Sequence, residues 1–197
     1  MPKCYSEHEK SFIKKRLKEE AGDCLARYGI KGTTVDELVR RVKIPKGTFY
    51  LFYKSKELLV FDVLMEQHER IEKELTASLS ALQSNDITCD GLTDLIFGFF
   101  KYTDENPLFR LLTSGELEIL ARKLPEEFLE NHFMEDGHMI ENVISILPGV
   151  RSVDIQSFAS AFRSLFMSML ASRKMNDEKS DEALKLLIRG LVIQMIP

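Results

Sequence analysis

Apolar side chains recur along this sequence at the three- and four-residue intervals that place them on one face of a helix. The first predicted helix covers residues 11–28, where Ile13, Leu17 and Ala21 share such a face and Gly29 follows as the expected C-terminal cap. The same spacing predicts further helices over residues 35–42, 46–52, 55–83, 92–102, 107–124, 126–147, 154–174 and 181–196. Turn-forming residues separate these segments, so we expect an all-α protein.

Helix-capping residues mark two of the predicted starts. Thr34 opens the sequence Thr-Val-Asp-Glu, in which its hydroxyl and the Glu37 carboxylate can each bind a backbone N–H at the start of the helix. Ser55 precedes the long fourth helix in the same way. Pro45 disfavours helical backbone at Ile44, so a tight turn separates the short second and third helices.

The composition is typical of helices packed around apolar interiors. The chain has 197 residues, of which 44% are hydrophobic, enough for one core or for a small domain joined to a larger one. Phe and Met number 13 and 8, whereas Gly and Pro number 10 and 6. Loop-rich and β-rich folds are therefore disfavoured.

Cysteine usage and the apolar windows point to the cytoplasm. Cys4, Cys24 and Cys89 are odd in number and lack CxxC spacing, which argues against a disulfide framework and a structural zinc site. Neither a signal-peptide core nor a membrane-spanning window is evident, so we expect a cytoplasmic protein. Cys24 lies on the inward face of the first helix, where a thiol is inert; a redox sensor at Cys4 or Cys89 stays open.

Charge is distributed unevenly, although the formal net charge is only −4. Residues 1–56 hold 14 Lys and Arg against 7 Asp and Glu, whereas the rest of the chain holds 13 against 24. A polyanion would be attracted to the first part and repelled by the second. This asymmetry is expected when one domain contacts phosphate and the other does not.

Two short helices joined by a tight turn, the second preceded by Pro45, describe a helix-turn-helix. The residues TTVDEL at 33–38, Val42 and IPKGTFYLFYKSKEL at 44–58 closely resemble the signature of the TetR family of transcriptional regulators. The likeness covers about residues 10–60. A packed three-helix bundle with merely solvated lysines is the alternative.

The resemblance implies a helix-turn-helix DNA-binding domain over residues 1–54 and a larger helical domain for effector binding and dimerisation over 55–197. It also implies a set of DNA contacts at the start of the second, third and fourth helices. These residues are Thr34, Lys46, Gly47, Thr48, Tyr50, Leu51 and Lys56. Of these, Lys46, Thr48 and Leu51 would read bases, whereas the others would contact the backbone.

Gly47 and Leu51 bear on how the third helix would meet DNA. Gly47 has no side chain, so the helix start can approach the sugar-phosphate backbone closely. Leu51 stands where the family often has a polar residue, so a thymine-methyl contact replaces hydrogen-bonded readout in our interpretation. TetR-like sequences more commonly have Tyr followed by Phe at the positions where this sequence has Phe52 followed by Tyr53. We assign Phe49 and Tyr53 to the core.

Broad apolar stripes follow the last two predicted helices, which in TetR-like proteins meet as a four-helix bundle between two subunits. We therefore expect a homodimer. The interface residues that we predict are Phe158, Phe162, Leu165, Leu187 and Leu191. The alternative is that these stripes face only the subunit's own core.

Phe and Met are frequent in the larger domain, and some of them are expected to line a cavity for a hydrophobic or amphipathic effector. The predicted pocket residues are Phe97, Phe100, Phe109, Phe133, Met134 and Met167. Ordinary core packing is the alternative for each of them. The carboxylates of Glu116 and Glu118 could bind a cationic effector, but we interpret these residues as part of a solvated face.

No catalytic signature is evident. The sequence has no GxSxG, GxxxxGK[ST], HExxH or GxGxxG motif, so we expect neither an enzyme nor a cofactor. His132 and Asp136 have the i, i+4 spacing of metal ligands. However, Gly137 follows directly after Asp136 and favours a solvated helix end, so we predict no metal.

The combined hypothesis is a dimeric repressor that binds double-stranded operator DNA and is released by a small-molecule effector. Effector binding would move the fourth helix and change the separation of the recognition helices. A ligand- or partner-binding protein whose head no longer binds DNA is the rival. An activator with the same head is a third alternative.

Overall fold

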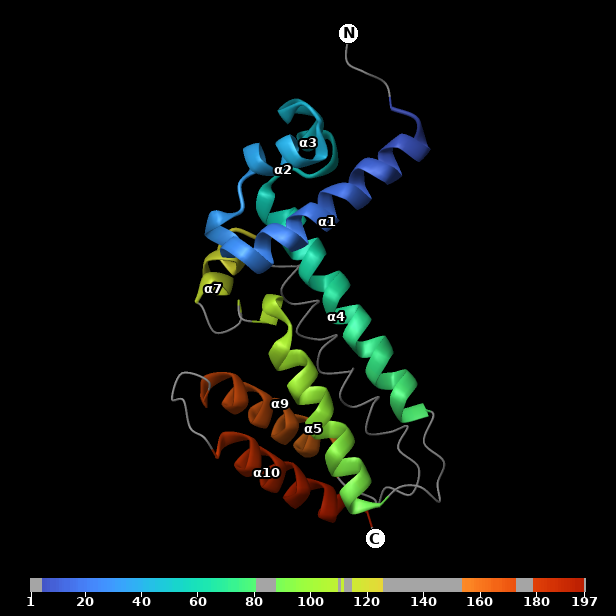
Figure 1. Cartoon of the computed structure of the whole chain (residues 1–197), viewed down its shortest axis with the longest axis vertical. Helices are drawn as coiled ribbons and strands as arrows, with labels where there is room; N and C mark the ends of the chain where they lie inside the picture. The colour runs from blue at the N-terminus through green and yellow to red at the C-terminus, as the bar shows by residue number, and fades with distance from the viewer. Residues whose placement is uncertain are drawn as a thin grey trace. The chain divides into compact units, whose positions relative to one another are not determined.

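The computed structural model describes residues 5–80, 88–109, 111, 115–125, 154–172 and 179–196. Every regular element within them is a helix, which confirms the predicted all-α fold (Figure 1). None of the described helices combines the length and apolar character that crossing a lipid bilayer requires.

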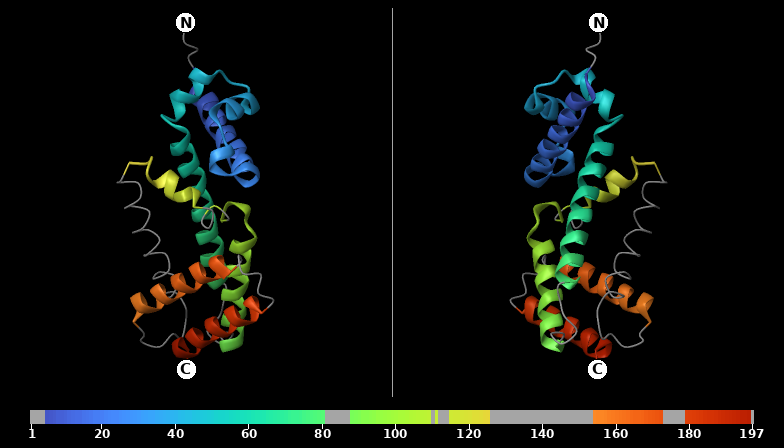
Figure 2. Two further views of the ribbon diagram at one scale, coloured as in Figure 1. Left: turned by 90° about the vertical axis from the view of Figure 1, so that its left-hand side faces the viewer. Right: turned by 90° about the vertical axis from the view of Figure 1, so that its right-hand side faces the viewer.

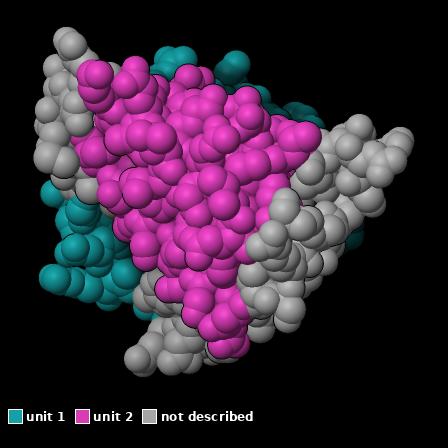
Figure 3. Space-filling model, turned by 90° about the horizontal axis from the view of Figure 1, so that it is seen from below, with its two compact units in different colours: residues 1–69, 110–126 teal, residues 70–109, 127–197 magenta. Residues whose placement is uncertain are grey.

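The chain forms two compact units, coloured separately in Figure 3. Unit 1 comprises residues 1–69 and 110–126, and unit 2 comprises residues 70–109 and 127–197. The division falls inside a single helix, α4, and not after residue 54. The functional boundary expected at residue 54 stays a prediction.

Unit 1 contains a three-helix head and two elements that pack on it (Figures 1 and 2). Its helices are α1 (Glu7–Gly32), α2 (Val35–Val42), α3 (Lys46–Phe52), the first part of α4 (Lys56–Ser80) and α7 (Glu116–Ala121). Helix α2 packs against both α1 and α3, and α7 packs against α1.

Helix α1 begins earlier than its apolar spacing predicts. The Ser6 hydroxyl accepts a hydrogen bond from the Glu9 N–H at 3.3 Å, and the Glu9 carboxylate accepts one from the Ser6 N–H at 2.8 Å. This capping box starts the helix within a polar segment, where hydrophobic periodicity carries no signal. Gly29, the expected cap, has φ 70° and forms a kink, after which a last short stretch continues to Gly32.

The predicted bounds of α3 are confirmed, and both predicted caps form. The Thr34 hydroxyl accepts from the Glu37 N–H at 3.2 Å, and the Ser55 hydroxyl accepts from the Leu58 N–H at 3.3 Å. Only half of the predicted capping box at Thr34 forms, because the Glu37 carboxylate binds arginines of its own helix instead.

Unit 1 has an apolar interior to which the head and α4 both contribute. Its largest fully buried side chains are Leu17, Leu25, Leu38, Phe49, Leu59 and Val60. Phe49 is 0% exposed and Tyr53 is 6% exposed, which confirms that both belong to the core. Cys24 is also buried, and burial raises the pKa of its thiol, in keeping with the predicted inert role.

Unit 2 is built on the remainder of α4, on α5 (Cys89–Glu105), η1 (Pro107–Phe109), α9 (Ile155–Ser172) and α10 (Ser180–Met195). Helix α10 packs against both α5 and α9. The largest side chains of its core include Leu92, Phe100, Phe162, Leu170, Ile188, Val192 and Met195.

The prediction of one continuous helix over residues 107–124 is wrong. Pro107 starts a single 3-10 turn that ends at Phe109, and α7 begins at Glu116. Gly115 precedes α7 with φ 73°, a left-handed conformation that interrupts helical backbone. The predicted helix over residues 126–147 lies outside the described residues.

Candidate nucleic-acid interface

The turn between α2 and α3 determines which side of α3 faces outward. Lys43 ends α2 in the left-handed conformation with φ 59°, and the Ile44 N–H donates to the Val39 carbonyl at 3.0 Å. Pro45 then precedes α3, and its carbonyl accepts from the Thr48 N–H at 2.9 Å. Backbone hydrogen bonds therefore define this turn closely.

Helix α3 presents a mixed polar and apolar face. Tyr50 is 49% exposed and Leu51 is 69% exposed, whereas Phe49 points into the core. The Tyr50 ring packs edge-on against Phe49 with centroids 5.3 Å apart. At Gly47, no described atom lies within 4 Å of the position that a Cβ would take. The fold of the head itself does not require glycine there, so a partner approaching closely is a physical reason for it.

Lys46 already has an anionic neighbour. Its Nζ lies 2.8 Å from Asp36 Oδ1 of α2, and this hydrogen bond raises the pKa of the lysine. Both side chains are more than half exposed, so the pair is weakly held. A base or phosphate can therefore compete for Lys46 by replacing Asp36.

Thr48 departs from the expected arrangement. It is only 7% exposed, and its Oγ1 lies 3.3 Å from the hydroxyl of Tyr5, a residue that precedes α1. Because Thr48 is buried and its hydroxyl contacts Tyr5, Thr48 as placed does not reach outward to a base. A base contact by Thr48 would require Tyr5 to move, and its role stays a prediction.

Thr34 and Lys56, expected on the DNA backbone, lie at the starts of their helices. Thr34 is exposed and caps α2. Lys56 is partly buried and its Nζ donates to the Ile30 carbonyl at 2.8 Å, so it also holds the end of α1. An ammonium has three donors, which leaves capacity for a phosphate beside the carbonyl.

Behind α3, Tyr53 and Asp62 connect the head to α4. The Tyr53 hydroxyl donates to Asp62 Oδ2 at 2.6 Å, and Lys18 Nζ of α1 lies 3.0 Å from Asp62 Oδ1. Burial acts to raise the pKa of Asp62, but the hydrogen bonds from Tyr53 and Lys18 outweigh it, and the pKa lies below its ordinary value. The carboxylate thereby joins the end of α3, α1 and α4.

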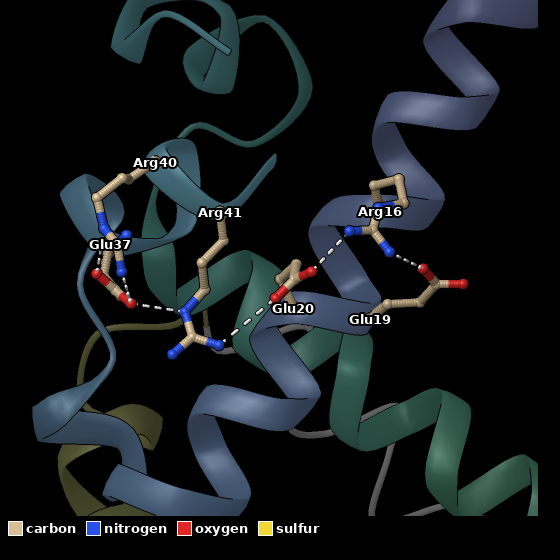
Figure 4. Close-up of polar contacts among 6 residues, drawn as sticks. All are labelled: Arg16, Glu19, Glu20, Glu37, Arg40 and Arg41. Carbon is tan, nitrogen blue, oxygen red and sulfur yellow. Dashed lines mark hydrogen bonds and ion pairs between the residues drawn. The ribbon is translucent and has the colours of Figure 1, made fainter. Parts of the chain in front are cut away.

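A line of ion pairs connects α1 to α2 (Figure 4). Arg41 is the link between the helices, because its Nε donates to Glu37 Oε1 at 2.6 Å and its Nη1 lies 3.5 Å from Glu20 Oε2. The further members are Arg16, Glu19 and Arg40. Hydrogen bonds from Arg40 and Arg41 lower the pKa of Glu37 to about 2, so this carboxylate stays charged.

Glu116 contradicts the expectation of a solvated face. Its Oε2 accepts a hydrogen bond from the Ile30 N–H at 2.6 Å, and the Ile30 carbonyl in turn accepts from Lys56. The residues that follow α7 contact α4 as well, since Lys123 Nζ lies 2.9 Å from Glu57 Oε1. Glu116 is therefore a structural contact to the kinked end of α1, and Glu118 is the exposed one of the pair.

The expected pocket residues are only partly described. On α5, Phe100 is buried and packs edge-on against Phe166 at 5.6 Å between centroids, and Phe97 is half-buried. Met167 is 53% exposed, which places it on the outer face of α9 and not on an enclosed wall. The Phe109 side chain and the whole of Phe133 and Met134 lie outside the described residues.

The expected dimer residues divide between surface and core. Leu187 is 55% exposed on α10, and Phe158, Leu165 and Leu191 are half-buried in the single chain. Phe162 is 8% exposed and belongs to the core of unit 2, so it offers little surface to a partner. The inward stripe of α9 runs through it, which the sequence pattern alone could not distinguish from an interface stripe.

Sequence reasoning missed Tyr5 and Asp62 and assigned Glu116 the wrong role. Tyr5 and Glu116 contact partners 43 and 86 residues away, and no local pattern carries such information. Asp62 lies nine residues after Tyr53, a separation that has no regular helical meaning across the break between α3 and α4. As for metal ligands, the described residues hold no group of three suitable side chains, and His132 and Asp136 lie outside them.

A helix-turn-helix with an exposed second helix, joined to a larger helical unit, defines a class of DNA-binding regulators. Residues 19–63 match the model of bacterial regulatory proteins of the tetR family. Over these residues the protein is similar to the TetR family of transcriptional regulators.

Solved structures share this fold over nearly the whole chain. A TetR transcription regulator from Haloarcula marismortui matches with a TM-score of 0.70 and 14% identity, covering 95% of this chain and 100% of that one. FadR from Bacillus subtilis, solved with stearoyl-CoA, matches with a TM-score of 0.62 and 15% identity over 92% and 98% of the two chains. A protein from Saccharomonospora viridis solved with choline matches with a TM-score of 0.64 and 14% identity over 93% and 96%. No curated protein sequence matches this chain.

Proposed function

We propose that the protein is a homodimeric cytoplasmic repressor that binds operator DNA through α3 and leaves it when a small apolar or amphipathic effector binds. The observation that carries this proposal is the outward face of α3, where Gly47, Tyr50 and Leu51 are exposed beside Lys46. An exposed leucine next to an aromatic hydroxyl and a cation suits the major groove, which offers thymine methyls, acceptors and phosphates.

The charge pattern supports a nucleic-acid partner for the head. The excess of cations lies in residues 1–56, which include α1, α2 and α3, and the rest of the chain is acidic. Electrostatic attraction to phosphate would therefore orient the protein with the head toward DNA. Tyr50 and Thr34 would fix the register on the backbone, while Lys46 and Leu51 would read bases.

Dimerisation is proposed through the outer faces of α9 and α10. Leu187 is more than half exposed there, and Leu191 follows one helical turn later. A single short recognition helix contacts few base pairs, so two of them on adjacent half-sites are needed for useful affinity. Dimers are typical of the family.

Effector coupling is proposed to run through α4. This helix is continuous from Lys56 to Ser80, begins in unit 1 directly after the Ser55 cap and ends in unit 2. A displacement of its C-terminal part would thus be transmitted to the base of α3. The ligands in the FadR and Saccharomonospora viridis structures make an amphipathic or cationic small molecule a reasonable effector class to test first.

The test uses duplexes that the wild-type protein selects from random-sequence DNA. Fluorescence anisotropy over a salt series should show affinity falling with a log-log slope of about −0.9 per neutralised phosphate. Lys46→Ala should relax the base preference, whereas Tyr50→Phe should weaken binding to all sequences alike. A thermal-shift screen with acyl compounds and lipophilic cations would then supply candidate effectors.

Three outcomes separate the rival functions. Failure to select any DNA would favour a head that has lost DNA binding. A reporter gene placed behind the selected site should be silenced, whereas increased expression would indicate an activator. Effector binding that leaves the operator affinity unchanged would contradict the coupling through α4.

A further inference from the structure

The first turns of α1 border the outward end of α3. A groove lies between them, with Lys10, Lys14 and Glu7 on the α1 side and Leu51 and Phe52 on the α3 side. Leu51 is therefore shared between this groove and the outward face of α3. The groove is a direct continuation of the surface proposed to enter DNA.

Both lysine side chains are about half exposed. The Lys10 side chain is 49% exposed and lies 2.7 Å from Glu7, which is 91% exposed. Lys14 is 52% exposed, lies 5.7 Å from the centroid of the Tyr53 ring, and is 3.8 Å from Asp62. Exposed ion pairs of this kind contribute little, so a phosphate can replace Glu7 at small cost.

Tyr5 belongs both to this groove and to a contact with the recognition helix. Its ring lines the groove, and its hydroxyl is 3.3 Å from Thr48 Oγ1. Since Thr48 is only 7% exposed, Tyr5 determines whether the Thr48 hydroxyl is directed at Tyr5 or at DNA. Tyr5, Lys10 and Lys14 all precede residue 19, where the match to the tetR family model begins.

We propose that this groove is a second DNA contact, in which Lys10 and Lys14 bind the operator's sugar-phosphate backbone beside α3 and Tyr5 determines the base preference through Thr48. The inference rests on the proposed operator binding by α3. Charge complementarity and the shared Leu51 wall identify the occupant as the nucleic-acid backbone, because a phosphate beside the recognition helix lies within reach of both lysines.

The first experiment measures salt dependence and phosphate contacts. With the selected duplex, Lys10→Gln and Lys14→Gln should each reduce the steepness of the log-log salt slope by about 1.8, because one contact is lost in each of the two half-sites, and the double variant by about 3.6. Ethylation interference should lose one phosphate contact per half-site for each substitution. Lys15→Gln is the matched control, because Lys15 is 75% exposed on the same helix but does not line the groove.

The second experiment isolates the hydroxyl of Tyr5. Tyr5→Phe keeps the ring and removes the hydroxyl that contacts Thr48, so it should change preference among selected sequences by about fivefold while the salt slope stays constant. Thr48→Val, combined with Tyr5→Phe in a double-mutant cycle, should add no further change if the two hydroxyls act together.

The outcomes distinguish this inference from the proposed function. Wild-type binding with unchanged slopes and phosphate contacts in the Lys10 and Lys14 variants would overturn the groove contact and leave operator binding by α3 intact. An equal effect of Lys15→Gln would show general electrostatics and overturn it as well. Independent, additive effects of Tyr5→Phe and Thr48→Val would overturn the role assigned to Tyr5. If wild-type protein selects no DNA, the proposed function itself fails.

Discussion

At the scale of single residues, two glycines of the head have opposite reasons to be glycine. Gly29 has φ 70° and ψ −174°, a region that is essentially restricted to glycine, and a Cβ there would lie 2.6 Å from Glu116 Oε2. Gly47 has ordinary helical backbone and open space around it. The first is required by the fold of the chain, and the second leaves room for the close approach of DNA that we propose.

Gly47→Ala should therefore separate folding from DNA binding. Alanine is the better helix former, so the melting temperature should stay constant or rise slightly. A methyl group at this position would stand between α3 and the sugar-phosphate backbone, and affinity for the selected duplex should fall about tenfold. Calorimetry and anisotropy measure the two effects, and unchanged affinity would contradict the close approach at Gly47.

Tyr53→Phe tests the hydrogen bond that joins α3 to α4. The lost bond ends on a charged but partly exposed carboxylate, so the expected cost is about 1 kcal/mol, or a fall in melting temperature of roughly 2–4 °C at neutral pH. Tyr28→Phe is the control, because Tyr28 is 53% exposed. Equal melting temperatures for wild type and Tyr53→Phe would show that this hydrogen bond does not stabilise the fold.

The same pair gives a pH dependence of known sign. The pKa of Asp62 is below its ordinary value of 3.8 in the folded protein, so its charge stabilises the fold above that pH and the contribution is lost as the pH falls through the lowered pKa. The difference in melting temperature between wild type and Asp62→Asn should therefore be constant near neutrality and shrink below pH 3.8. A difference that grows on acidification would mean that Asp62 is not stabilised as the anion.

At the scale of elements, the kinked end of α1 is the point where three helices meet. The Ile30 N–H binds Glu116 of α7, and the Ile30 carbonyl binds Lys56 of α4. The Thr33 hydroxyl also donates to the Gly29 carbonyl at 2.8 Å, immediately before the cap of α2. The position of α2, and through it that of α3, thus depends on backbone geometry at Gly29.

Gly29→Ala should destabilise the head through this junction. The backbone strain alone is expected to cost about 1–3 kcal/mol, and the displaced Glu116 adds to it. Gly22→Ala in the same helix is the matched control, because its Cβ would meet Val63 Cγ1 at an ordinary 3.8 Å. The melting temperature should fall by several degrees in the first variant and stay constant or rise in the second. Equal values for both would contradict the strain at Gly29.

At the scale of the whole molecule, the acidic unit 2 is expected to join two copies while the basic heads meet DNA. The α10 face formed by Leu184, Ile188 and Val192 is buried in its own unit, which leaves Leu187 on another side of the helix. Leu186 is also exposed, but it lines a charged groove with Asp94, Lys185 and Arg189. Two adjacent leucines therefore face different surroundings.

Leu187→Glu should convert the dimer into monomers, because it would bury two charges against each other at a symmetric interface. Leu186→Glu is the matched control and should leave the dimer intact. Light scattering coupled to size-exclusion chromatography measures both. A dimer that survives Leu187→Glu would place the interface elsewhere.

The helices and the motif could be read from sequence because their causes are local. The break at Pro45 and the cap at Ser55 delimited α3, and the caps at Thr34 and Ser55 follow from side chains within three residues of the N–H groups they bind. The start of α1 was missed because its first turn is polar. The break before α7 was missed because one glycine in a left-handed conformation overrides the apolar spacing on either side.

By itself, the sequence determined the all-α class, the helix-turn-helix and the uneven charge, since each depends on neighbours in the chain or on totals. Only the tertiary structure decided that Tyr5 contacts Thr48, that Glu116 accepts a hydrogen bond from Ile30, and that Phe162 is core while Leu187 is surface. These contacts join residues far apart in sequence. A stripe of apolar side chains indicates that a helix face is buried, but only the packing of the folded chain decides which element or partner covers it.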